Sequence, residues 1–137
     1  SSINVIANGE IWNPADALRC LQVTGCKDLM LGRGVLCRPD LPRQVAALNK
    51  TQAPESLHWE QIPPLLLHFF ELNLANYDAR YAPNPVKQWL AYLRAYFPQA
   101  ALLFESIKRL RDPQELHARL RAEVERVQID IKMTATA

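Results

Sequence analysis

Two short polar clusters are the part of this sequence whose residue types and spacing could bind a ligand. Asn-Gly-Glu at 8–10 directly follows an apolar run at 3–7, and Gly-Arg-Gly at 32–34 directly follows a second apolar run at 29–31. Glycines allow backbone N–H groups to approach an anion closely, and an arginine adds a rigid fork of donors. The pattern therefore suits a phosphate group, although two turn glycines beside a surface arginine would look the same.

A strand–helix–strand unit would bring these two clusters together. The apolar runs at 3–7 and 29–31 are short and end at glycine-containing clusters, which predicts buried strands. Between them, Asn13 followed by Pro14 predicts the start of a helix, and Gly25 predicts its end. Parallel strands in such a unit end at the same edge of a sheet, which is where α/β folds bind ligands.

The rest of the chain is predicted to be helical. Strand signals stop after about residue 39, and a connector with Thr51, Gln52 and Pro54 follows a short helix. Beyond it, apolar residues recur with the spacing of amphipathic helices, and the short connections favour an antiparallel bundle. The predicted helices span 41–48, 59–76, 85–96, 98–111 and 113–129, with Asn84 and Asp112 as helix caps and a frayed tail from 133.

Positive charge is concentrated in one block of the predicted helical region. The net charge is only +2, but residues 80–111 hold six Lys or Arg against one Glu, while residues 51–79 hold no Lys or Arg and four Asp or Glu. Two pairs share a stripe of a predicted helix, namely Lys87 with Arg94 and Lys108 with Arg111. Such a block suits nucleic-acid phosphates, whose binding depends on salt, although a solvated helix face is equally consistent with it.

Composition excludes several classes of protein. With 49% hydrophobic and 22% charged residues among 137, the chain is neither mostly disordered nor collagenous. No apolar run reaches the roughly 18 residues of a membrane span, and no signal peptide opens the sequence. Three cysteines without a CxxC spacing predict reduced thiols, and neither they nor the three histidines have the spacing of metal ligands. We therefore expect a cytoplasmic protein without membrane or metal partners.

Three runs of the sequence match motifs of one known family. Val-Ile-Ala-Asn-Gly-Glu-Ile-Trp lies at 5–12, Gly-Cys-Lys-Asp-Leu-Met-Leu-Gly-Arg-Gly at 25–34, and Val-Lys-Gln-Trp-Leu-Ala-Tyr-Leu-Arg at 86–94. The first two resemble the end of the barrel in tRNA-dihydrouridine synthases, and the third resembles the signature helix of their tRNA-binding domain. The first two also occur in other FMN barrels, whereas the third is more specific. The motifs are most similar to those of the bacterial C-type branch.

This resemblance implies an FMN-dependent, NADPH-driven enzyme that reduces a uridine of tRNA to dihydrouridine. The family's FMN contacts match Asn8, Gly9, Glu10, Gly32 and Arg33. Its tRNA contacts match Lys87, Tyr92 and Lys108, to which the charge pattern adds Arg94 and Arg111. The family's catalytic Cys belongs to an earlier barrel loop, so no catalytic residue is expected in this chain. Pro85 stands where the C-type branch has Arg, so the resemblance does not fix which uridine is modified.

The expected fold is mainly α, with a C-terminal helical bundle preceded by the last two βα units of a TIM-type (β/α)8 barrel. We assign 1–50 to the end of an FMN-binding barrel and 51–137 to a helical tRNA-binding domain. A whole barrel needs about 200–250 residues. Because the chain also starts without Met, we expect the C-terminal part of a longer enzyme. Such a part would be inactive alone and could associate with itself through open strand edges.

Two other functions stay open at this point. The helices could be an RNA- or protein-binding appendage of another FMN barrel enzyme that acts on a small substrate. Alternatively, the chain could be a non-enzymatic interaction module with the βα units as scaffold. A titration with tRNA at several salt concentrations tests these alternatives, because salt-dependent tRNA binding by residues 80–111 is the specific expectation for a tRNA-modifying enzyme.

Overall fold

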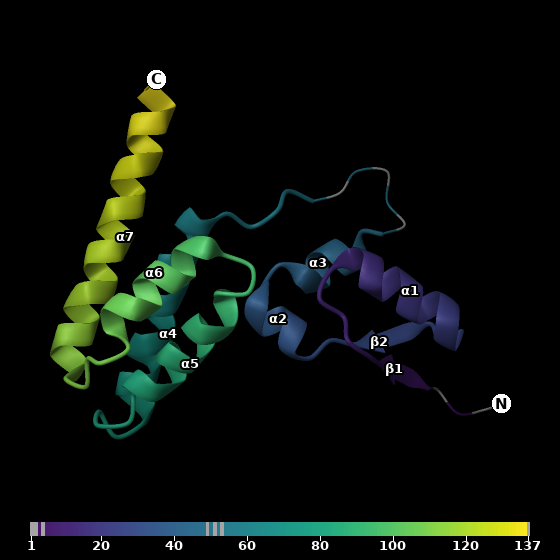
Figure 1. Ribbon diagram of the computed structural model, residues 1–137, viewed down its shortest axis with the longest axis horizontal. Helices are drawn as coiled ribbons and strands as arrows, with labels where there is room; N and C mark the ends of the chain where they lie inside the picture. Colours follow the sequence, from purple (N-terminus) through teal and green to yellow (C-terminus); the bar gives the residue numbers. More distant parts are fainter. Residues whose placement is uncertain (1–2, 4, 49, 51, 53, 137) are drawn as a thin grey trace. The chain divides into compact units, whose positions relative to one another are not determined.

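The chain divides into two compact units, Ser1–Leu57 and His58–Ala137 (Figure 1). The computed structural model describes residues 3, 5–48, 50, 52 and 54–136. The break between the units follows Leu57, later than the predicted boundary at residue 50. The assignment of the units to a barrel end and a tRNA-binding domain stays a prediction.

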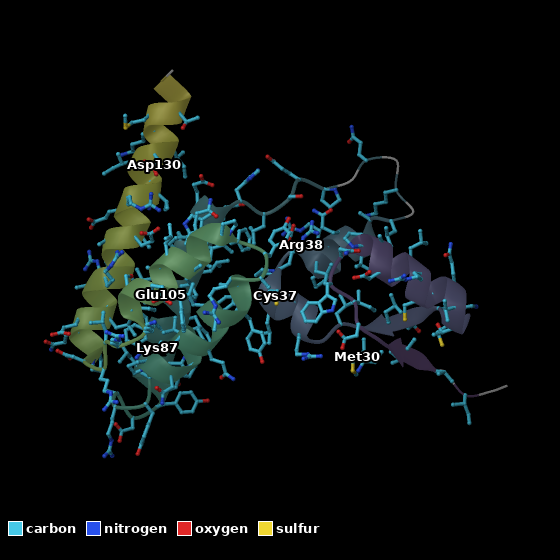
Figure 2. All side chains as sticks on the ribbon, in the orientation of Figure 1. Met30, Cys37, Arg38, Lys87, Glu105 and Asp130 are labelled. Carbon is cyan, nitrogen blue, oxygen red and sulfur yellow. The ribbon has the colours of Figure 1, made fainter. Side chains whose placement is uncertain are left out.

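Three polar side chains of the first unit hold the segment at 54–57, which is why the break comes late. Gln44 Nε2 donates a hydrogen bond to the Pro54 carbonyl oxygen at 3.0 Å, and the Leu57 N–H donates to Asp40 Oδ2 at 3.0 Å. Arg38, labelled in Figure 2, donates from its Nε to Asp40 Oδ1 at 3.1 Å, so both oxygens of this buried carboxylate have partners. We call Arg38, Asp40 and Gln44 the linker clamp.

The first unit contains the predicted strand–helix–strand arrangement. Strands β1 (Ile6–Asn8) and β2 (Asp28–Met30) pair in parallel, with Ala7 opposite Leu29, and α1 (Pro14–Thr24) connects them. Asn13 Oδ1 caps α1 by accepting a hydrogen bond from the Asp16 N–H at 2.8 Å. Gly25 ends the helix with φ 69°, a conformation that glycine adopts without strain. The prediction of both helix ends is confirmed.

The first strand is shorter than the sequence predicted, the second begins and ends one residue earlier than predicted, and both are more exposed. The first begins at Ile6, where we expected a strand over 3–7, and Asn4 lies outside the described residues. Ala7 is buried and Leu29 is half-buried, whereas Ile6 and Met30 are 57% and 55% exposed. Successive side chains of a strand point to opposite faces. Within the first unit, a helix therefore covers one face only, and the prediction of buried strands is wrong for the other face.

Two short helices complete the first unit, and the first of them was not predicted. Helix α2 (Arg33–Cys37) begins inside the Gly-Arg-Gly cluster, which we expected to be a loop, and α3 (Leu41–Ala46) follows. The core of the unit consists of Ile11, Ala17 and Leu41, with partly buried residues such as Leu31 packed against them. This core ties the segments that carry both polar clusters to each other.

The second unit is helical. A 3-10 turn, η1 (Trp59–Gln61), precedes α4 (Ile62–Asn76), α5 (Pro83–Leu93), α6 (Pro98–Ile107) and α7 (Pro113–Thr136). Prolines occupy the first turn of all four α-helices, where a missing N–H breaks no helical bond. Helix α4 packs against α5 and α7, and α5 packs against α6 (Figure 1). The buried side chains between them include Leu66, Phe70, Leu90, Ile107 and Leu120.

Several helix ends differ from the predicted ones. Helix α5 begins at Pro83, so Asn84 lies in its first turn and is not its cap. Helix α6 ends at Ile107, four residues before the predicted end at 111. Helix α7 continues to Thr136, so the tail expected to be frayed is helical as far as it is described. Asp112 Oδ1 accepts a hydrogen bond from the Gln114 N–H at 3.1 Å, as expected for a cap. None of the helices described is long and apolar enough to cross a membrane.

Candidate functional site

Both polar clusters line one cavity in the first unit. They meet because each follows one of two parallel strands that end at the same edge of the sheet. The cavity has a volume of about 370 Å³. Its lining residues come from the end of β1, the connection that follows it and the segment that leads into α2, and they are Asn8, Gly9, Glu10, Ile11, Trp12, Gly32, Arg33 and Gly34. The structure thus brings together all five residues that we predicted to bind the cofactor.

Glu10 fixes two other side chains at this cavity. Arg33 Nη2 donates to Glu10 Oε1, and Trp12 Nε1 donates to Glu10 Oε2, each at 3.0 Å. The Arg33 guanidinium carbon also lies 5.6 Å from the centre of the Trp12 ring, within the range of a cation–π contact. The Arg33 and Glu10 side chains are 62% and 73% exposed, so this ion pair contributes little to stability, at most about 1 kcal/mol. Its effect is to orient the arginine.

The sequence reasoning did not identify Trp12 as a site residue. The indole lies two residues after Glu10, and this spacing was the only local signal that the two side chains could meet. A third partner, Arg33, comes from the other strand connection and is visible only in three dimensions. Trp12 therefore joins the residues that a ligand in the cavity would contact.

The three glycines at the cavity serve different purposes. A Cβ atom at Gly34 would lie 2.1 Å from the Ile11 carbonyl oxygen, so α2 can pack against the β1–α1 connection only with glycine there. A Cβ at Gly32 would meet no atom within 4 Å, and one at Gly9 would lie 3.6 Å from Cys20 Sγ. Gly34 is thus required by packing. Gly32 instead leaves open space beside the exposed backbone, into which an anion could come close.

The five predicted tRNA-binding residues all belong to the second unit, but they do not form one continuous group. Three of them have the following surroundings. Arg94 lies with its guanidinium carbon 4.4 Å from the centre of the Phe104 ring, and its Nε donates to the Ala91 carbonyl oxygen at 3.2 Å. Lys108 Nζ pairs with Glu105 Oε2 at 2.6 Å, and this hydrogen bond lowers the pKa of Glu105. Tyr92 is half-buried on α5.

Lys87 and Arg111 form a separate group. Lys87, labelled in Figure 2, is half-buried on α5, and its Nζ donates to the Leu110 carbonyl oxygen. Burial lowers the pKa of Lys87, and the nearby charge of Arg111 lowers it further. Lys108 and Arg111 do not share a helix stripe as predicted, because α6 ends before both of them.

A second cavity, of about 620 Å³, contains the Lys87–Arg111 pair. Two exposed residues that we had not singled out also line it, Arg80 and Tyr81. They lie between α4 and α5, in a connection with no recognisable motif. The signal in the sequence was that Arg80 opens the basic block at 80–111.

The cysteines and histidines form no metal site in the part of the chain that the structure describes. Among the residues described, no group of three or more His, Cys, Asp or Glu side chains could hold a metal ion. Cys20, Cys26 and Cys37 are all free thiols, and burial raises the pKa of Cys37.

Comparison with known proteins agrees with the resemblance of the motifs. The family model "Dihydrouridine synthase (Dus)" matches residues 1–131. A tRNA-dihydrouridine(16) synthase of Aquipseudomonas alcaligenes is 41% identical over 114 residues, which are 83% of this chain and 36% of that protein. The enzyme of the same name from Pseudomonas putida is 43% identical over 107 residues, 78% of this chain and 33% of that protein. One from Pasteurella multocida is 42% identical over 120 residues, covering 87% and 36%.

The chain spans about a third of the length of these curated relatives. The family model nevertheless matches the whole chain apart from its last residues. The cavity of the first unit lies within the matched range, as does the second unit apart from residues 132–137. The chain belongs to the dihydrouridine synthase family.

Proposed function

We propose that this chain is part of a flavin-dependent enzyme that reduces a uridine of tRNA to dihydrouridine, with NADPH as the reductant. The observation that carries the proposal is the single cavity in which Asn8–Glu10 and Gly32–Gly34 meet, in a chain of the dihydrouridine synthase family. By similarity to relatives whose name specifies position 16, the uridine is the one at that position. Since the substrate is tRNA, we place the enzyme in the cytoplasm.

The residues at the cavity fit the phosphate end of FMN. The open space beside Gly32 allows a phosphate to approach the backbone, and Arg33 supplies a planar fork of donors that Glu10 and Trp12 hold in place. Asn8 and Gly9 line the same cavity and are the remaining residues proposed to contact the cofactor. A bound flavin would supply hydride transfer from NADPH to the uracil ring. The role of this chain in that reaction is to bind and orient the cofactor.

The second unit is proposed to bind the tRNA. Its basic block offers Lys87, Arg94, Lys108 and Arg111 to phosphates, and Tyr92 is a candidate for contact with a base or sugar. Because the chain covers about a third of its relatives, we propose that the residues for proton transfer to the uracil lie outside it. The 137-residue chain alone would therefore not reduce tRNA.

The test uses the protein at its full natural length. We expect it to purify with a bound flavin and to convert uridine to dihydrouridine in unmodified tRNA when NADPH is added. Replacing Arg33 with Ala should lower the flavin content and activity together, and excess FMN should restore activity. Arg19→Ala is the matched control, because Arg19 is an exposed arginine of the same unit that does not line the cavity. A protein that binds no flavin, or that binds flavin and leaves tRNA unchanged, would contradict the proposal.

A further inference from the structure

The second cavity is lined by cations at the meeting point of three segments of the second unit. Arg80 comes from the α4–α5 connection, Lys87 from α5, and Arg111 from the α6–α7 connection. Tyr81, Pro83 and Asn84 also line this cavity. Among the described residues that line this cavity, none is a carboxylate. The cavity therefore concentrates positive charge from parts of the chain that are far apart in sequence.

The cations there are only partly satisfied by the protein. Lys87 Nζ uses one of its three N–H groups on the Leu110 carbonyl oxygen and keeps two for a ligand. Arg80 Nη2 lies 3.5 Å from Asp78 Oδ2, and both side chains are exposed, so this pair exchanges readily with a stronger acceptor. The Arg111 guanidinium has no hydrogen-bond or ion-pair partner within the part of the chain that the structure describes. Each of these three cations therefore keeps donors that a ligand in the cavity could accept from.

An aromatic ring stands beside these cations. The Arg80 guanidinium carbon lies 5.0 Å from the centre of the Tyr81 ring, and Tyr81 is 57% exposed. In proteins that bind single-stranded nucleic acid, exposed aromatic rings stack on bases while neighbouring cations hold the backbone. Sulfate or free phosphate would use the cations and would have no use for the ring. The combination fits a nucleotide within an RNA chain.

We propose that the cavity formed by Arg80, Lys87 and Arg111 binds a phosphodiester of an unpaired nucleotide of RNA, and that Tyr81 stacks on the attached base. The inference rests on the proposed tRNA substrate and deepens it. It divides the basic block into two classes. Lys87 and Arg111 bind RNA directly in this cavity, together with Arg80 and Tyr81. Arg94 and Lys108 lie outside this cavity, in contact with Phe104 and Glu105 respectively, and contribute less to affinity.

The test measures binding of unmodified tRNA to the full-length protein at several salt concentrations. We expect Arg111→Ala to weaken binding about tenfold or more, as for loss of a charged hydrogen bond. It should also reduce the slope of log affinity against log salt by roughly 0.7–0.9. Arg109→Ala is the matched control, because it removes the same charge two residues away and outside the cavity. Circular dichroism and thermal melting confirm that each variant is folded.

A second pair of variants tests the stacking. Tyr81→Leu should weaken tRNA binding about tenfold with the salt slope unchanged, whereas Tyr77→Leu, at an exposed tyrosine outside the cavity, should leave it as it was. Equal effects within either pair of variants would overturn the assignment of an RNA nucleotide. So would a raised KM for NADPH in Arg111→Ala, since the cavity would then hold a phosphate of the cofactor.

The outcomes separate this inference from the proposed function. If the wild-type protein reduces tRNA while Arg111→Ala binds it as well as Arg109→Ala does, only the cavity assignment fails. If the flavin-loaded wild-type protein neither binds nor reduces tRNA, the proposed function fails and the inference with it.

Discussion

Replacing Gly34 with alanine should damage the flavin site by displacing the backbone around it. The added Cβ would lie 2.1 Å from the Ile11 carbonyl oxygen and 3.0 Å from Leu41 Cδ2. An ordinary contact between carbon and oxygen needs more than 3 Å, so α2 and the β1–α1 connection would have to separate by about 1 Å. Overpacking of this kind costs about 1–3 kcal/mol, and a contact with backbone belongs at the upper end.

The higher helix propensity of alanine opposes the cost of overpacking in Gly34→Ala. The difference between the two sets the expected loss in free energy of unfolding. Alanine favours a helix over glycine by about 1 kcal/mol, so the net loss in free energy of unfolding should be about 2 kcal/mol. Urea denaturation of the full-length protein measures this loss, and flavin absorbance measures occupancy of the site. Both should fall in Gly34→Ala.

Gly32→Ala is the control for this prediction. No atom lies within 4 Å of a Cβ at that position, so Gly32→Ala should lose less free energy of unfolding than Gly34→Ala does, while its methyl group weakens flavin binding from inside the cavity. If Gly34→Ala proved as stable as Gly32→Ala, the reasoning that α2 needs glycine to pack would be refuted.

Three further outcomes are expected. Glu123 is buried on α7 and accepts a hydrogen bond from Arg126 Nε at 3.1 Å, which lowers the pKa of Glu123. The stabilisation that ionised Glu123 contributes is therefore complete above the ordinary glutamate pKa and is lost as pH falls through the lowered value. The urea midpoint should therefore decline less in acid for Glu123→Gln than for the wild type, and parallel curves would contradict this. Asp40→Ala should speed proteolysis at 54–57, whereas an unchanged cleavage rate would show that the linker clamp does not restrain this segment. The 137-residue chain should elute as an oligomer in size-exclusion chromatography because its strand edges are open, and a monomer would refute that expectation.

The sequence predicted the features that depend on neighbours along the chain. Asn13 and Gly25 bound α1 as expected, because a cap and a left-handed glycine act within one turn. The meeting of the two polar clusters also followed from local signals, since parallel pairing is enough to place both at one edge. The family resemblance was carried by such contiguous motifs, and the comparisons confirm it.

The features that the sequence did not predict depend on partners distant along the chain. Helix α2 begins within a cluster of two glycines, which disfavour helix, and packing of Gly34 against Ile11 offsets this preference. The charge pattern treated the basic residues as one surface. The packing of the helices decides which cations contact another side chain, as Arg94 contacts Phe104 and Lys108 contacts Glu105. The spacing of basic residues along the sequence does not contain this information.

The linker clamp has a consequence for how the length of this chain can vary. Pro54 and Leu57 are hydrogen-bonded back to Gln44 on α3 and to Asp40 just before it. The first unit therefore fixes the chain on both sides of the stretch that precedes Pro54. Residues inserted into that stretch would leave these hydrogen bonds in place, so insertions there should be tolerated. A deletion between Pro54 and Leu57, in contrast, would break one of the two hydrogen bonds.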